Sequence, residues 1–208
     1  MQSTRFKITE LLIIFIIIPI SFLFEYSTII KLLIAVCGLL YIVYCLLKFD
    51  KKYFKIDKNL NWKKFWKTTF IKFLIIATIT TLFVWFTNQE NLFSILLEKP
   101  KLWIFILFFY SVFSVYPQEL IYRTFFFQRY QILFKNKLTF IFINASLFSL
   151  AHILFKSSLV LLLTFIGGIL FAYTYKESKS TLLVSIEHAI YGSWLFTVGM
   201  GNMLGFPS

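Results

Sequence analysis

Long, nearly uninterrupted apolar segments are the feature that most constrains the fold of this chain. Its 208 residues are 59% hydrophobic and only 14% charged, whereas a soluble domain is nearer about 45–50% apolar and about 25% charged. About 20 apolar residues let a helix cross a bilayer, and only helices or closed barrels satisfy their backbone there. The expected spans are approximately Ile8–Phe24, Thr28–Leu47, Phe70–Phe86, Leu102–Phe134, Leu138–Leu154, Ser157–Tyr175 and Thr181–Met200. The sequence therefore predicts an all-α, polytopic transmembrane helix bundle with about seven membrane helices, or eight with one short addition.

The chain length indicates a single integral membrane domain over residues 1–208, because no stretch is long enough for a separate soluble domain. Residues 1–101 would form the N-terminal spans, and residues 102–200 the helices around a site. Pro117 lies in the middle of Leu102–Phe134 and predicts a kinked or broken helix there. If that segment crosses once, the N-terminus and the lysine-rich loops share one side, which the positive-inside rule assigns to the cytoplasm.

The stretch 48–72 is the most basic part of the chain, and aromatic residues interleave with its lysines. Such a pattern fits an amphipathic segment on an anionic membrane surface, although an ordinary solvated cytoplasmic loop fits equally well. A net charge of +12 would suggest nucleic acid as the partner of a soluble protein. Here the lysines lie mainly in loops, so we expect anionic lipid as the partner of residues 48–72 and no nucleic acid.

Apart from the charges toward the ends of spans, five membrane-embedded ionisable residues stand out: Glu119, Arg123, His152, Glu187 and His188. Buried charges cost several kcal/mol each unless they are paired or hydrated, so they usually mark a site. Glu119 and Arg123 are four residues apart and share a helix face, which makes an ion pair the competing structural interpretation. A neutral histidine beside a carboxylate can deprotonate water, and a second histidine can stabilise an oxyanion. We expect the helices to bring Glu119, Arg123, His152 and His188 together.

Three short motifs carry a resemblance to a known family. Residues 118–123 (QELIYR) resemble Glu-Glu-x-x-x-Arg, residues 148–152 (FSLAH) match Phe-x-x-x-His, and residues 188–192 (HAIYG) resemble His-x-x-x-Asn. In this order they are similar to the CAAX protease and bacteriocin-processing (CPBP, or Abi) intramembrane proteases, over about Ser111 to Gly199. The resemblance implies a helical hydrolase of the bacterial cytoplasmic membrane that cleaves a peptide or protein substrate at that membrane. It also implies that glutamate and the first histidine activate water, while the second histidine with asparagine forms the oxyanion site.

Two positions depart from the family pattern. Gln118 stands where the family has its first glutamate, and an amide cannot act as a base at neutral pH. Gly192 stands in place of the final asparagine and has no side-chain donor. Glu119 would then serve as the base, or else only neutralise Arg123. The missing polar group would come from Tyr191, Ser193 or Glu187.

The sequence leaves three functions to compare. The first is an intramembrane endopeptidase that needs no cofactor; zinc is a weaker alternative, since no His-Glu-x-x-His helix is present. The second is a catalytically impaired family member that acts as a membrane scaffold or bacteriocin-immunity-type protein, which Gln118 and Gly192 would favour. The third is a small transporter with Glu119 and the histidines as a proton relay, although the paired broken helices of an internal repeat are missing.

Overall fold

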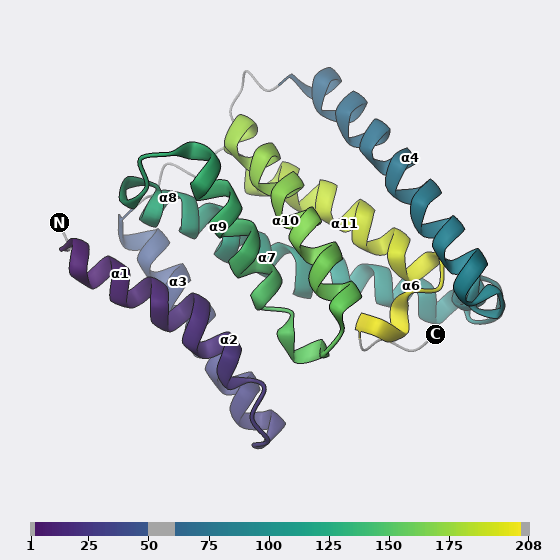
Figure 1. The fold of residues 1–208 in the computed structure, drawn as a ribbon, viewed down its shortest axis with the longest axis horizontal. Coiled ribbons are helices and arrows are strands. Elements are labelled where there is room, and N and C mark those ends of the chain that lie inside the picture. Colours follow the sequence, from purple (N-terminus) through teal and green to yellow (C-terminus); the bar gives the residue numbers. More distant parts are fainter. Residues whose placement is uncertain (1–2, 50–60, 205–208) are drawn as a thin grey trace. The chain divides into compact units, whose positions relative to one another are not determined.

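The computed structural model describes residues 3–49 and 61–204, and within these residues it contains helices and no β-strand (Figure 1). The α-helices are α1 (Thr4–Leu12), α2 (Ile18–Ser21), α3 (Thr28–Phe49), α4 (Trp62–Thr87), α5 (Ser94–Glu98), α6 (Pro100–Phe109), α7 (Tyr116–Glu119), α8 (Phe126–Tyr130), α9 (Lys137–Leu150), α10 (Ser158–Ser178) and α11 (Thr181–Thr197). Three π-helical turns lie at Ile13–Ile17, Tyr110–Val115 and Leu120–Phe125, and 3-10 turns at Gln89–Asn91, Gln131–Leu133, Ile153–Phe155 and Gly201–Leu204. The expected all-α class is confirmed for the described residues.

Within residues 3–49 and 61–204, five helices are long and apolar enough to cross a membrane: Thr28–Lys48, Trp62–Thr87, Pro100–Leu133, Lys137–Phe155 and Ser158–Ser178. Many large apolar side chains on these helices are exposed, as expected for helices that face lipid. The chain is therefore an integral membrane protein. The expected first and last spans are helical too, but Thr4–Ser21 carries Arg5, Lys7 and Glu10, and α11 has only 17 residues. A count of seven or eight spans stays a prediction.

Two sequence expectations differ in detail from the structure. Of the two alternatives at Pro117, a kinked or a broken helix, the broken one is wrong, because the helix runs without interruption from Pro100 to Leu133. The preceding turn, Tyr110–Val115, is π-helical, and a widened turn accommodates the missing N–H and the bulk of the proline ring. In the basic stretch 48–72, residues 50–60 lie outside the described residues. Residues from Trp62 onward belong to α4, which begins eight residues before the expected span, with Asn61 accepting a bond from the Lys64 N–H at its start.

The chain forms two compact units that each combine an N-terminal with a C-terminal part. The first unit contains, among the described residues, 3–49 and 118–181. Its centre is the pair α9 and α10, which run antiparallel and lie side by side (Figure 1). A Cβ at Gly168 on α10 would lie 3.0 Å from the Ala145 Cα on α9, so the glycine permits this close packing. Ser157 caps α10, and Lys179, in the left-handed conformation, ends it.

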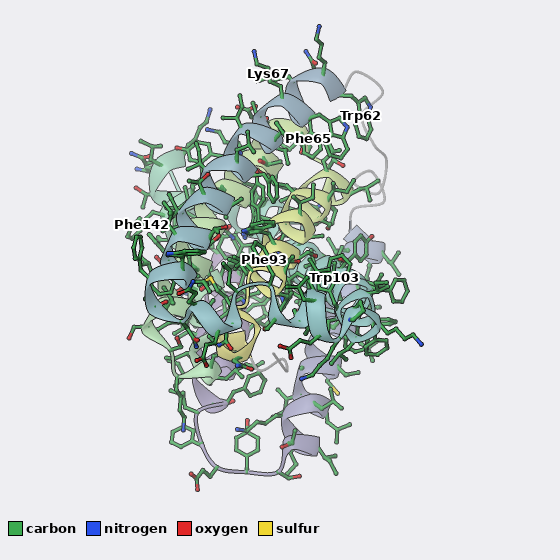
Figure 2. All side chains as sticks on the ribbon, turned by 90° about the vertical axis from the view of Figure 1, so that its right-hand side faces the viewer. Trp62, Phe65, Lys67, Phe93, Trp103 and Phe142 are labelled. Carbon is green, nitrogen blue, oxygen red and sulfur yellow. The ribbon has the colours of Figure 1, made fainter. Side chains whose placement is uncertain are left out.

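The second unit contains the described residues 61–117 and 182–204. In it α11 is joined to α4 by side-chain hydrogen bonds: Tyr191 donates to the Thr69 carbonyl at 3.1 Å, and Trp194 donates to the Thr80 hydroxyl at 3.0 Å. Figure 2 shows Trp62 and Phe65 at the beginning of α4, where their rings meet edge to face. The buried cluster of this unit comprises Ile95, Ile106, Tyr110, Val115 and Phe196.

Candidate functional site

Glu119 and Arg123 form an ion pair that is completely buried. The Arg123 Nε lies 3.3 Å from Glu119 Oε2, and neither side chain has any exposed surface. Glu119 ends α7 and Arg123 lies in the following π-helical turn, so the pairing predicted from the four-residue spacing is present. Gln118, the preceding residue, is only partly buried. A charge pair without access to water is costly unless further polar contacts support it.

Arg123 has those further contacts, and they reach α9 and α10. Its Nη1 donates to Asn144 Oδ1 at 2.7 Å, and its Nη2 donates to the Gly168 carbonyl at 3.3 Å. The guanidinium also lies over the rings of Phe148 and Phe171, 4.8 and 5.9 Å from their centroids. Arg123 thereby links three helical segments of the first unit at one point.

Asn144 is a residue that the sequence interpretation missed. It is fully buried in the middle of α9, and its amide donates to the Tyr122 carbonyl at 2.7 Å while its oxygen accepts from Arg123. A carboxamide with both ends bonded fixes the guanidinium in one orientation. The available signal was a single asparagine in the middle of a mostly apolar helix.

His152 follows the C-terminal end of α9 and is half-buried. Its Nδ1 lies 2.8 Å from the Phe148 carbonyl oxygen. Since a carbonyl can only accept, Nδ1 carries the proton in the neutral ring and Nε2 is the basic nitrogen. The Phe148 ring packs against His152 at 4.9 Å and also lies under Arg123, so Phe148 connects the two motif residues within the first unit.

His188 belongs to the second unit, where its ring packs edge to face against Tyr110 with centroids 6.0 Å apart. A Cβ at Gly192 would lie 2.0 Å from the Tyr110 hydroxyl oxygen. The space of a side chain at position 192 is therefore already filled by a phenol from the segment before α7. Tyr110 also packs on Phe196 at 4.8 Å, which limits its movement. The sequence interpretation missed Tyr110, since nothing local relates it to Gly192.

Glu187 is also fully buried and has partners of its own. Its Oε1 accepts from Lys72 on α4 at 2.9 Å and from the Tyr191 hydroxyl at 2.9 Å. Tyr191 and Glu187, two of the residues expected to replace the missing asparagine, are thus engaged in joining α11 to α4. Ser193, the third, is partly buried, and its carbonyl accepts from Thr197 at 2.8 Å.

The predicted site residues thus occupy two groups, one in each unit. Glu119, Arg123 and His152 gather with Asn144 and Phe148 in the first, while His188 and Gly192 gather with Tyr110 in the second. The meeting of His188 with the first group stays a prediction. Among residues 3–49 and 61–204, no three His, Cys, Asp or Glu side chains are grouped to hold a metal ion, and the expectation of no cofactor stays untested.

Comparison with known proteins decides the family. Residues 100–194 match the family model described as "Type II CAAX prenyl endopeptidase Rce1-like", a stretch that contains all three motifs. This region belongs to the CAAX protease family. The assignment from the motifs is confirmed, and the family is one of proteases. Among the curated proteins and among the solved structures, no significant match was found.

Proposed function

We propose that this CAAX protease family member is an intramembrane endopeptidase that hydrolyses a peptide bond of a membrane-associated substrate. The observation that carries the proposal is the match over residues 100–194, which includes Glu119, His152 and His188. The proposed membrane is a bacterial cytoplasmic membrane, crossed seven or eight times with the N-terminus in the cytoplasm. Residues 48–72 would lie along anionic lipid, and no cofactor would be required.

In this proposal His152 and Glu119 activate water. The bond from His152 Nδ1 to the Phe148 carbonyl leaves Nε2 basic and fixes the ring, as a general base requires. Glu119 supplies the negative charge that favours the imidazolium formed when His152 takes a proton. Arg123, held by Asn144 and the Gly168 carbonyl, fixes the position of Glu119. Gln118, next to them, can bind a water or a substrate amide but cannot remove a proton.

A separate part of the proposal concerns the hydrogen-bond donors for the oxyanion. We assign to the Tyr110 hydroxyl the role that an asparagine at position 192 would have, because the hydroxyl occupies the place of that side chain. The hydroxyl is a donor, and the edge-to-face contact brings Tyr110 beside His188. One such donor is worth roughly 10²–10³ in kcat. Tyr110→Phe, which keeps the ring, should lower cleavage by about that factor at unchanged expression.

The experiment that tests the proposal compares the N-termini of membrane proteins, by mass spectrometry, in cells that carry the wild type, His152→Gln or Ser146→Ala. Ser146 is a matched control because it lies on the same helix and bonds only within it, to the Phe142 carbonyl. New termini should be present with the wild type and Ser146→Ala and disappear with His152→Gln. The same termini in all three strains, at equal protein levels, would refute the proposed mechanism.

A second candidate function, a catalytically silent membrane scaffold or immunity-type protein, is favoured by one observation. Glu119 is buried against Arg123, and the neighbouring position that would hold a second carboxylate is Gln118. In that case the wild type produces no new termini, and Gln118→Glu with Gly192→Asn should create activity. The structure shows that Tyr110 must be shortened in the same protein, as Tyr110→Ala, to admit the asparagine. Termini already present with the wild type would exclude this candidate.

A further inference from the structure

A pocket of about 210 Å³ lies in the first unit, at the end of the bundle where α9 begins and α10 ends. Lysines from two separate segments line it: Lys137 is the first residue of α9, Lys176 lies in the last turn of α10, and Lys179 follows α10. Gln131 adds an amide from the turn after α8. The floor of the pocket includes the rings of Phe127 and Phe140, both buried. The pocket thus combines a cationic rim with an apolar floor.

Within the described part of the chain, the positive charges of this rim are not neutralised by acidic side chains. Among the residues that the structure describes, no carboxylate forms an ion pair with Lys137, Lys176 or Lys179. Burial and then the charges of Lys176 and Lys137 lower the pKa of Lys179, which lies outside the membrane-spanning segments. Lys137 also places a cation at a helix N-terminus, where the helix dipole is unfavourable to it. An anion in the pocket would neutralise the unpaired positive charge, reduce the repulsion between the lysines and offset the unfavourable helix dipole at Lys137.

We propose that this pocket binds the phosphate of an anionic phospholipid. Three ammonium groups and an amide donor suit phosphate oxygens, and basic pockets at helix ends on the side of the positive loops are where headgroups are held. The floor of aromatic rings decides between a lipid and a free phosphate, because it offers apolar surface to the glycerol and the first acyl carbons. Lys179 already lies over the Phe127 ring, 5.7 Å from its centroid, which holds its ammonium group at the pocket.

The test uses the purified full chain in a neutral detergent, with phosphatidylglycerol retention measured by native mass spectrometry. Phosphatidylcholine with the same acyl chains is the lipid control, and glycerol phosphate and inorganic phosphate are the soluble competitors. The pocket variant is Lys137→Gln/Lys176→Gln. The matched variant Lys101→Gln/Lys135→Gln removes two exposed lysines that do not line the pocket. Lys179 is left in place because it also ends α10 and packs over the Phe127 ring, so its substitution would change the local structure as well as the charge.

We expect phosphatidylglycerol affinity to fall about tenfold or more in the pocket variant and to change little in the matched variant. Phosphatidylcholine should bind weakly to all three proteins. Equal loss in both variants, or equal binding of the two lipids, would overturn the pocket as the binding site. Displacement of the lipid by inorganic phosphate or glycerol phosphate at similar concentrations would overturn the lipid assignment. If the double variant fails to fold, Lys137→Gln alone should still fold, since this side chain is exposed, and it should still weaken phosphatidylglycerol binding.

Discussion

Two glutamate–arginine pairs lie in the first unit, and they differ in which partner makes most of the hydrogen bonds. In the pair of Glu10 and Arg129, the carboxylate is the centre: it accepts from Arg129 Nε at 2.6 Å, from Arg129 Nη2 at 2.9 Å, from Tyr130 at 3.0 Å and from Tyr41. In the pair of Glu119 and Arg123, the guanidinium is the centre, and its terminal nitrogens are directed at Asn144 and Gly168.

The difference separates a structural contact from a candidate catalytic one. Glu10 is held by two aromatic hydroxyls and a forked arginine, which leaves the carboxylate no capacity for chemistry and docks α1 on α8. The motif arginine instead directs its terminal nitrogens to neutral acceptors on α9 and α10 and approaches its glutamate through Nε. We infer that Arg123 maintains the fold of the site, whereas Glu119 is the part that chemistry can use.

The largest effect is expected for Arg123→Met, which removes the centre of the motif pair. It leaves a buried carboxylate and the acceptors on Asn144 and Gly168 without their donor, and breaking a buried pair costs about 3–5 kcal/mol. Thermal unfolding in detergent should show a clearly lower midpoint than for Arg129→Met, because the Arg129 side chain is 11% exposed and its partner Glu10 can reach water more easily. Equal midpoints for the two variants would contradict the comparison.

The second-largest loss of stability is expected for Glu10→Gln, which changes the carboxylate of the Glu10–Arg129 pair. Glu10→Gln should destabilise the chain by about 2–3 kcal/mol, since an amide nitrogen would face donors from Arg129, Tyr130 or Tyr41. Faster protease cleavage near α1, together with a lower midpoint, is the measurement. Glu25→Gln serves as the control because Glu25 is exposed. If cleavage is unchanged in Glu10→Gln, the network does not dock the N-terminal helix.

A smaller loss is expected at Asn144. Asn144→Leu keeps the branched shape of the side chain but removes the acceptor of Arg123 and the donor to the Tyr122 carbonyl, at a cost of about 1–3 kcal/mol. The substitution should also displace Glu119. The cleavage rate should therefore fall by more than the loss of folded protein accounts for. Ser146→Ala on the same helix should change neither quantity. Activity that follows only the fraction of folded protein would show that Asn144 has no positioning role.

The sequence predicts the local part of this arrangement. The five long apolar helices follow from length and composition, and the pairing of Glu119 with Arg123 follows from their spacing on one helix. The motifs also identified the family correctly. Asn144 carried a readable signal, because an asparagine in the middle of an apolar span requires a partner.

The contacts between distant segments could not be predicted in the same way. Glu10 and Arg129 are 119 residues apart, and Glu10 lies near the end of an expected span, where charges are common. The Tyr110 hydroxyl occupies the space beside Gly192 because of how one helix approaches another. Neither residue carries a sequence signal for this contact. Helix periodicity and composition can be read from a single sequence. Which side chains of different helices meet depends on how the helices pack, and that is specified only in the folded chain.

The smallest effect on stability is expected for Glu119→Gln, and it tests the comparison most directly. Arg123 would lose its counter-ion but keep Asn144, the Gly168 carbonyl and the rings of Phe148 and Phe171. We expect these contacts to offset most of the usual cost of breaking a buried pair and leave about 1 kcal/mol, less than for Glu10→Gln. Cleavage, in contrast, should fall at least about tenfold, because the amide cannot support a positive charge on His152. The exposed Glu98→Gln is the control for both measurements. A stability loss as large as that of Arg123→Met would mean that Glu119, like Glu10, is a structural centre, and full activity in a stable variant would assign the proton transfer to His152 alone.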